Sequence, residues 1–197
     1  NKWFEKRCGS KYSNNDKYIK VTELSGEILK LTDYHHGEVS LHNTIIKANQ
    51  NFVNCVNNYP ILKAGGMFGT RNGGGNDHGS PRYLSTKLHD LYKLIIKKDE
   101  FHLLEKNKND NNEDIEPVVF YPILPILLIN GSNGIGCGWK STIYCRNIYE
   151  IIEKLKNKIN GNNSKINLNM FFKGFKGEIN NNKTNGKLFK IKNKKND

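Results

Sequence analysis

The sequence predicts an α+β fold, in which a mainly helical N-terminal region precedes a region of strands and one further helix. Three observations lead to this expectation. Apolar residues recur at helical spacing between Thr22 and Val53. The stretch 65–77 is mostly glycine, asparagine and aspartate, which favour turns. The stretch 118–129 is apolar, rich in β-prone residues and interrupted by proline.

Two helices are expected near the N-terminus. The first runs from Thr22 to Leu31, with apolar residues close to i, i+4, i+7 spacing and Thr22 as its N-cap. The second runs from Gly37 to about Val53 and carries a broad apolar face. Only the short segment 33–36 separates them, so the pair is predicted to form a helix-turn-helix.

The glycine-rich stretch 65–77 is expected to be a loop that lets the backbone approach another molecule closely. Helix is predicted again from about Pro81 to Ile96. The asparagine-rich stretch 105–116 is expected to be an irregular connection and a domain boundary, which gives the predicted domains 1–116 and 117–197.

The second predicted domain begins with the apolar run 118–129. Pro122 and Pro125 interrupt it, which favours edge strands or a kinked strand, and a glycine-rich turn at 131–138 is expected to close it. An amphipathic helix is predicted from Ile148 to Ile159. The composition of the asparagine and lysine tracts after residue 160 predicts weak structure.

The chain is strongly basic. Its formal net charge of +12 comes from 31 lysines and arginines against 19 aspartates and glutamates in 197 residues. A polyanion is therefore the first partner to expect. A low-GC genome is the alternative source of the charge, because such coding bias enriches lysine and asparagine together.

The four cysteines are scattered, without a C-x-x-C pair or a histidine at metal-ligand spacing, and are Cys8, Cys55, Cys137 and Cys145. They predict reduced, intracellular thiols and no metal site. No apolar run approaches the roughly 20 residues of a membrane-spanning helix and no signal peptide is evident, so a soluble protein is expected. The chain begins without methionine, which indicates a piece of a longer protein.

Chemistry is suggested first by Ser80-Pro81-Arg82-Tyr83, which follows the glycine-rich stretch. A tyrosine phenol is almost entirely protonated at neutral pH, so it needs a neighbouring cation or base to attack phosphorus. Arg82 would supply that charge and would also stabilise a five-coordinate phosphoryl transition state. The alternative interpretation is that Tyr83 is a buried aromatic residue at the start of a helix.

Several segments resemble, in the same order, motifs of the type IIA DNA topoisomerases. The matching segments are Tyr34–Glu38, Phe68–Arg71 with Gly74–Asp77, Ser80–Tyr83, Tyr121–Pro125, Asn130–Trp139 and Lys173–Gly177. The similarity runs from about Lys20 to Gly177. Any one motif would be a weak signal, whereas their order and spacing together are specific. The adjacent histidines and the Gly-Thr-Arg loop resemble the eukaryotic and large-virus enzymes more than bacterial gyrase.

The resemblance implies a winged-helix DNA-binding domain followed by the start of an α/β tower domain. It also implies ATP-dependent type II topoisomerase activity, in which both DNA strands are cleaved and resealed through a 5'-phosphotyrosine link. Tyr83 would be the nucleophile, Arg82 would stabilise the transition state, and His36 would contact the scissile phosphate or relay a proton.

Four further residues are implied to lie at the DNA-binding surface. Lys20 and Arg71 would contact DNA, and His35 would have a mainly structural part beside His36. Ile135 lies between two glycines, so its exposed side chain would enter the minor groove and unstack a base step. A core isoleucine in a tight turn is the alternative.

The family also implies cofactors and partners. Mg2+ and ATP would be bound by domains missing from this chain, so the piece alone is expected to be inactive and to hold no metal. Double-stranded DNA and a second copy of the protein are the expected partners, with no membrane. The expected location is the nucleus, or a viral factory in the cytoplasm if the source is a large DNA virus.

This sequence departs from the family pattern at Lys63, Met67, Asn76 and Cys137, where two glutamines, a lysine and a threonine are usual. These changes bear on drug response and sequence preference. Two other functions compete. A non-catalytic winged-helix DNA-binding or architectural module would share the helices, and a nucleotide-binding loop at Gly134–Gly138 is disfavoured because its spacing is not G-x-G-x-x-G before a helix.

Overall fold

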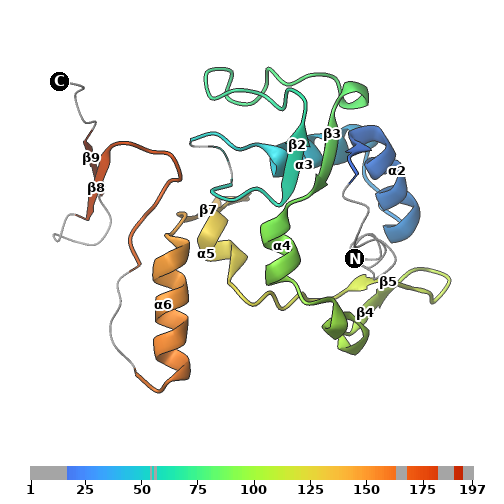
Figure 1. The fold of residues 1–197 in the computed structure, drawn as a ribbon. Helices are drawn as coiled ribbons and strands as arrows, with labels where there is room; N and C mark the ends of the chain where they lie inside the picture. Colours follow the sequence, from blue (N-terminus) through green and yellow to red (C-terminus); the bar gives the residue numbers. More distant parts are fainter. Residues whose placement is uncertain (1–16, 54, 56, 163–167, 182–188, 193–197) are drawn as a thin grey trace. The chain divides into compact units, whose positions relative to one another are not determined.

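The computed structural model describes residues 17–53, 55, 57–162, 168–181 and 189–192. They divide into two compact units, drawn in Figure 1. Unit 1 contains the chain up to Gln50 and Pro60–Ile123, and unit 2 contains Asn51–Tyr59 and the chain from Leu124 onward. The assignment of a winged-helix domain to 1–116 and a tower domain to 117–197 stays a prediction.

The expected pair of N-terminal helices is confirmed by α2 (Val21–Thr32) and α3 (Glu38–Asn49). Lys20, and not Thr22, is the N-cap of α2, and its side chain makes no capping hydrogen bond. Helix α3 ends earlier than expected because Gln50 has an extended backbone, with φ −64° and ψ 133°.

A three-stranded antiparallel sheet follows the helices in unit 1. Its order is β1 (Ile19–Lys20), β3 (Ser85–Leu88) and β2 (Leu62–Gly65), so β3 is the central strand. Two helices and a small antiparallel sheet are consistent with a winged helix, and Figure 1 shows β2 and β3 side by side near α3.

The helix predicted from Pro81 to Ile96 is wrong for its middle part. Only the 3-10 turn η2 (Pro81–Tyr83) and the short helix α4 (Asp90–Ile95) are helical. Strand β3 lies between them, and its residues alternate between half-buried and fully buried positions. That period of two is typical of a strand with one face on a core.

The core of unit 1 is apolar except for one buried polar pair. The Thr86 hydroxyl donates to the side-chain carbonyl of Asn49 at 2.7 Å, which ties β3 to the end of α3. Both residues are almost completely buried, at 0% and 1% exposed. The apolar residues of unit 1 with under 2% exposure are Val21, Leu24, Ile46, Leu84 and Tyr92.

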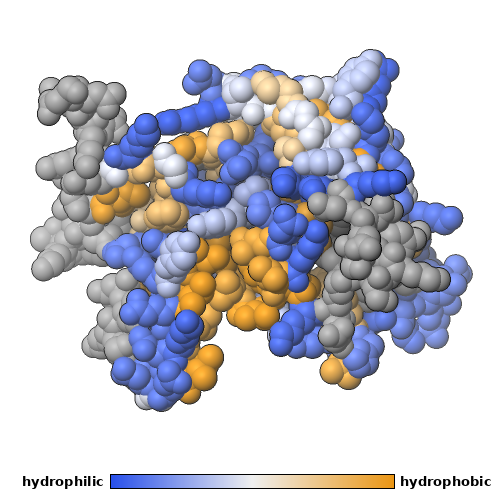
Figure 2. Space-filling model, viewed as in Figure 1, coloured by the Kyte–Doolittle hydropathy of each residue, from blue (hydrophilic) through white to orange (hydrophobic). Residues whose placement is uncertain are grey.

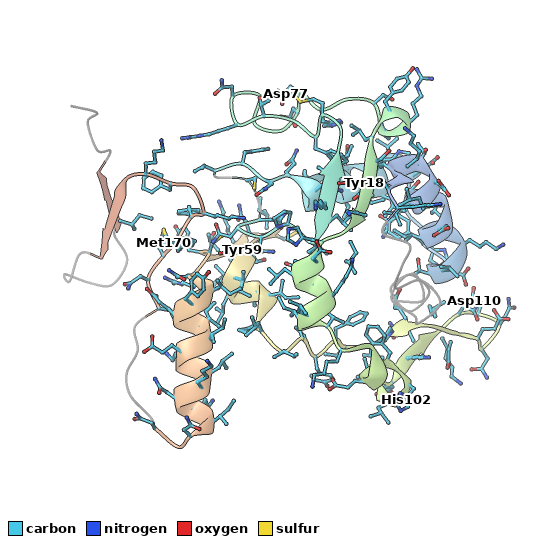
Figure 3. All side chains as sticks on the ribbon, viewed as in Figure 1. Tyr18, Tyr59, Asp77, His102, Asp110 and Met170 are labelled. Carbon is cyan, nitrogen blue, oxygen red and sulfur yellow. The ribbon has the colours of Figure 1, made fainter. Side chains whose placement is uncertain are left out.

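The asparagine-rich segment 105–116 is a hairpin and not an irregular connection. After the 3-10 helix η3 (Lys98–Leu103), β4 (Lys106–Lys108) pairs with β5 (Asp114–Pro117). The Asn109 carboxamide oxygen accepts backbone N–H groups of Asn111 and Glu113, and Asn112 adopts a left-handed φ of 62°. Asparagine favours such turns because its side chain mimics a backbone acceptor. Figure 3 labels Asp110 at the tip.

Unit 2 differs from the prediction in its first part. No strand lies between Val118 and Pro125, and helix α5 (Ile126–Asn130) occupies the end of the expected β-prone run. A short apolar run fits a buried helix as well as a strand, and Pro125 is placed at the start of this helix. The stretch 131–138 is mostly the strand β6 (Ser132–Gly136), with the turn only at residues 137 and 138.

The rest of unit 2 contains β7 (Trp139–Ile143), α6 (Ile148–Ile159), β8 (Glu178–Asn181) and β9 (Phe189–Lys192). Helix α6 has the predicted bounds, and the Asn147 side chain caps its first turn by accepting the Tyr149 N–H at 2.9 Å. The hairpin of β8 and β9 shows that part of the asparagine and lysine tract is regular structure.

The cysteines of the described residues, Cys55, Cys137 and Cys145, are free thiols, and Cys8 lies outside the described residues. Burial raises the pKa of the Cys145 thiol, whose sulfur donates to the Asn130 carbonyl. Among the described residues, no helix is long and apolar enough to cross a membrane.

One buried amide holds unit 2 together. The Asn58 side-chain nitrogen donates to the carbonyls of Ile129 at 3.2 Å and Phe171 at 2.7 Å, and its oxygen accepts the Lys173 N–H at 3.0 Å. Segment 51–59 is thereby joined to two parts of unit 2 that lie more than 70 residues further along the chain. The side chain is buried, so these bonds are protected from water.

We expect Asn58→Ala to lower the free energy of unfolding by about 2–4 kcal/mol, because it leaves three buried backbone groups without their partner. Urea unfolding of the 197-residue chain, followed by circular dichroism, measures the change. Asn162→Ala, at an exposed position of the same unit, is the matched control and should change the value by less than about 0.5 kcal/mol. Equal effects of the two variants would contradict the central place of Asn58.

Candidate DNA-cleavage site

Tyr83 lies at the end of the 3-10 turn η2, directly before the central strand of unit 1. Its backbone N–H donates to the Ser80 carbonyl at 2.9 Å, and Pro81 fixes the first residue of the turn. The side chain is 67% exposed. The interpretation of Tyr83 as a buried aromatic residue is therefore wrong, and its hydroxyl is open to another molecule.

Arg82 is next to this tyrosine in space as well as in sequence. Its guanidinium carbon lies 4.9 Å from the centre of the Tyr83 ring, which is a cation–π distance. Both side chains are exposed. A fixed cation beside the phenol is the arrangement needed to stabilise negative charge on the tyrosine oxygen or on a phosphoryl group bound to it.

The chain reaches this turn through a glycine-rich loop between β2 and η2. Its base is closed by a hydrogen bond from the Gly79 N–H to the Met67 carbonyl at 2.9 Å. Within the loop, the Gly75 N–H donates to the Thr70 carbonyl at 2.9 Å. Gly69 has φ +98°, and a Cβ there would lie 2.7 Å from the Gly75 carbonyl oxygen, so only glycine fits. The loop is therefore a folded structure that presents Arg71.

A carboxylate closes the middle of this loop. Asp77 accepts the Thr70 backbone N–H at 2.8 Å and the Thr70 hydroxyl at 2.5 Å with its two oxygens. The Thr70 hydroxyl in turn accepts the Gly73 N–H at 3.2 Å. These hydrogen bonds, the side-chain bond from Thr70 first, lower the pKa of Asp77. Figure 3 labels Asp77 in this loop, beyond the end of β2.

A second side chain holds the same loop from outside. The Gln50 amide nitrogen donates to the carbonyls of Phe68 at 3.0 Å and Gly75 at 2.9 Å. Gln50 is buried and follows the last residue of α3. The sequence interpretation missed it, although one signal was available: the chain has 30 asparagines and a single glutamine, Gln50.

The adjacent histidines lie between α2 and α3, and both are exposed. The His36 ring packs edge-on against Tyr34, with 5.3 Å between ring centres. His36 is thus supported from one side and comes two residues before α3, whose N-cap Gly37 has no capping side chain. His35 lines an open groove of about 680 Å³ between the end of α2 and the β4–β5 hairpin.

The structure brings only some of the expected site residues together. Exposed Lys20 pairs with Ser85 in the sheet, two residues after Tyr83, so Lys20 and Tyr83 lie on neighbouring elements. Arg71 is exposed in the glycine-rich loop. Within the described residues, no hydrogen bond or ring contact joins His36 or Arg71 to Tyr83. Their roles at the site stay predictions.

A serine, a histidine and a glutamate also meet in unit 1, but they do not form a catalytic triad. His42 Nε2 lies 2.9 Å from the Ser25 hydroxyl and 3.3 Å from a Glu38 carboxylate oxygen, so one ring nitrogen serves both partners. A triad uses the two ring nitrogens separately. Ser25 is also fully buried, so this cluster ties α2 to α3.

Ile135 lies in unit 2, on the exposed hairpin of β6 and β7. It is 82% exposed and pairs with Lys140 on the opposite strand, while Trp139 beside the turn is 78% exposed. The alternative of a core isoleucine is therefore wrong. Figure 2 shows that hydrophobic side chains, in orange, reach the surface among hydrophilic ones. Strand β7 follows Gly138 directly, so the helix of a nucleotide-binding loop is absent from this segment.

The described residues contain no group of three histidine, cysteine, aspartate or glutamate side chains that could hold a metal ion. The site residues therefore do not fit Mg2+ by themselves, and no step of the chemistry below passes through it.

Comparisons with known proteins agree with one another. The family model of DNA gyrase and topoisomerase IV matches residues 8–196. DNA topoisomerase 2 of Acanthamoeba polyphaga mimivirus is 43% identical over 161 residues, which cover 82% of this chain and 12% of the relative. DNA topoisomerase 2-alpha of Homo sapiens is 40% identical over 169 residues, which cover 85% of this chain and 11% of the relative.

A solved structure shows the same similarity in space. The crystal structure of the Plasmodium falciparum topoisomerase II DNA-binding, cleavage and re-ligation domain matches with a TM-score of 0.81 and 37% identity, over 85% of this chain and 23% of that chain. The mixed helix and strand fold is thus that of a topoisomerase II core. The chain belongs to the type IIA DNA topoisomerase family. It spans about a tenth of the length of the two relatives above.

We expect the Thr70–Asp77 contact to depend on pH. The pKa of Asp77 is lowered in the folded loop, so the contact is fully stabilising above the ordinary aspartate pKa of about 3.9 and is lost as the pH falls through the lowered value. The Thr70 amide resonance, followed by NMR from about pH 6 downward, should shift as Asp77 is protonated. In Asp77→Asn this shift should vanish, and its persistence would show that another group is responsible.

Proposed function

We propose that this chain is the DNA-binding and cleavage part of a type II DNA topoisomerase, with Tyr83 as the nucleophile. The observation that carries the proposal is an exposed tyrosine with an arginine over its ring, at the end of a glycine-rich loop, in a chain of this family. Each of these features answers a requirement for attack on a DNA phosphate: access, local positive charge and close approach.

The proposed reaction conserves the phosphodiester bond energy. The Tyr83 oxygen attacks the phosphorus, a bond from phosphorus to that oxygen forms, and the bond to the 3' oxygen breaks. The products are a 5'-phosphotyrosine and a free 3'-hydroxyl. The phenolic proton leaves to a base, for which we assign His36, and the 3' oxygen takes up a proton. Resealing is the reverse attack by the 3'-hydroxyl.

Binding of duplex DNA is supported by charge and by local structure. The chain carries a net charge of +12, and Lys20, Arg71 and Arg82 are exposed in unit 1. The N-terminus of α3 follows His36 and has no capping side chain, and such helix ends favour phosphate groups. We assign Lys20, Arg71 and His35 to contacts with the DNA.

The remaining properties of the family are part of the proposal. ATP-driven strand passage, an Mg2+ site and a homodimer are assigned to the complete protein, because the described residues hold no metal cluster and the chain spans about a tenth of its relatives. The isolated chain is then expected to be inactive. The proposed location is the nucleus, or a viral factory in the cytoplasm for a viral source.

Tyr83→Phe in the complete protein should abolish covalent attachment to DNA, because only the nucleophilic oxygen is removed. DNA affinity should stay within about twofold, since the exposed ring and Arg82 remain. Incubation with labelled duplex and Mg2+, followed by detergent and electrophoresis, detects protein joined to DNA 5' ends. Tyr92→Phe, at a buried tyrosine of the same unit, is the control and should leave attachment unchanged.

Two results of this assay would contradict the proposal. Adducts formed by the Tyr83→Phe protein would assign the chemistry to another residue. DNA binding by the parent protein without any adduct would favour a non-catalytic DNA-binding module, which is the second candidate function.

We further propose that Ile135 is a wedge that bends DNA. Its side chain is the most exposed large hydrophobic one of the β6–β7 hairpin, and glycines on both sides leave room for bases to approach it. Unstacking one base step costs on the order of a few kcal/mol and must be offset by contacts that the bent duplex gains.

Ile135→Ala should therefore reduce the bend angle of bound DNA more than it reduces affinity. Energy transfer between dyes at the two duplex ends measures the bend, and a filter-binding titration measures affinity. Ile159→Ala removes an equally exposed isoleucine from the end of α6 and should leave the bend unchanged. An unaltered bend in Ile135→Ala would exclude the wedge.

A further inference from the structure

We infer that Gln50 is a positioning residue for DNA cleavage, which fixes the glycine-rich loop between β2 and η2 to the end of α3. The inference rests on the proposed function, since it concerns the placement of Arg71 and Tyr83. It starts from two hydrogen bonds of one amide group, to the Phe68 carbonyl at 3.0 Å and the Gly75 carbonyl at 2.9 Å.

These two acceptors lie on opposite sides of the loop. Phe68 is on the strand that leaves β2 and is anchored in the core, at 5% exposed. Gly75 is on the returning side, and its N–H already bonds to the Thr70 carbonyl. The Gln50 amide therefore bridges the two sides of the loop below the exposed residue Arg71, and it does so from the neighbouring helix.

The loop is shaped around this amide. Gly75 has φ +79°, and a Cβ there would clash with the Gln50 amide nitrogen. A side chain at residue 75 is thus excluded both by backbone conformation and by Gln50 itself. Asn43, Lys47 and His78 line a small pocket of about 140 Å³ with Gln50 and Gly75, so the contact lies at the bottom of a surface depression.

Side-chain length explains why glutamine occurs here. Asparagine has the same amide on an arm that is shorter by one methylene, and this chain uses asparagine 30 times and glutamine once. The carbonyl of Asn49, one residue earlier, already serves the Thr86 hydroxyl in the core. Reaching the loop from the end of α3 requires the longer side chain.

The same helix connects the two parts of the proposed site. His36 precedes the first residue of α3 by two positions, and Gln50 follows its last residue. The loop ends at Ser80, whose carbonyl accepts the Tyr83 N–H. By fixing the loop to α3, Gln50 sets Arg71 and the Tyr83 turn against the helix that carries His36. A displacement of about 1 Å can cost on the order of a hundredfold in rate.

The test compares Gln50→Asn, which shortens the amide arm, with Gln50→Met, which keeps the length and removes the donor, in the complete protein. We expect both to slow single-turnover formation of the covalent DNA adduct by about ten- to a hundredfold. DNA affinity should change by less than about threefold, since charge is unaltered. Thermal unfolding of each variant reports any loss of stability.

Two controls separate positioning from stability. Asn49→Leu removes the adjacent buried amide, which bonds to the core and not to the loop, and should lower the melting temperature with a smaller effect on the rate per folded molecule. The double variant of Gln50→Met and Arg71→Ala should cut no more than about twofold slower than Arg71→Ala alone, because Gln50 acts through the loop that presents Arg71.

The outcomes are distinguishable. Slow cleavage with intact binding and non-additivity with Arg71→Ala supports the inference. Parent-like rates in both Gln50 variants, fully additive losses, or an equal loss in Asn49→Leu would overturn it and leave the proposed function standing. A parent protein that forms no adduct would overturn the proposed function, and the positioning role with it.

Discussion

A single buried hydrogen bond, from the Thr86 hydroxyl to the Asn49 carboxamide, joins the sheet of unit 1 to its helices. Strand β3 pairs with both other strands, so whatever holds β3 holds the sheet. Both partners are buried, and loss of either would leave an unpaired polar group that costs about 1–3 kcal/mol. Tyr83 lies three residues before Thr86, so the reactive phenol stands on the most firmly held strand of the unit.

Helices were easier to predict from the sequence than strands. The bounds of α6 follow from a clear apolar period and a capping asparagine, and α2 and α3 from the same kind of pattern. Strand β3 was missed because Leu84, Thr86 and Leu88 also fit a helical continuation from Pro81. Its identity depends on pairing with β1 and β2, which are distant in sequence.

The site was predictable where a short motif carried it and not where a long-range contact did. Arg82 and Tyr83 are adjacent in sequence, so their proximity needed no fold. The Gln50 contacts join residues 18 and 25 positions apart, and the direction of its side chain depends on the extended backbone that ends α3. The exposure of Ile135 depends on a hairpin that the sequence suggested only as a turn.

The inclusion of Asn51–Tyr59 in unit 2 has a mechanical consequence. The chain passes between the units after Gln50, again after Tyr59 and a third time after Ile123. Two bodies joined by one covalent connection can rotate about it, whereas several connections resist torsion and leave bending as the softer motion. The first of these crossings begins at Gln50, so any bending strain that reaches the end of α3 would be felt at the amide that holds the glycine-rich loop.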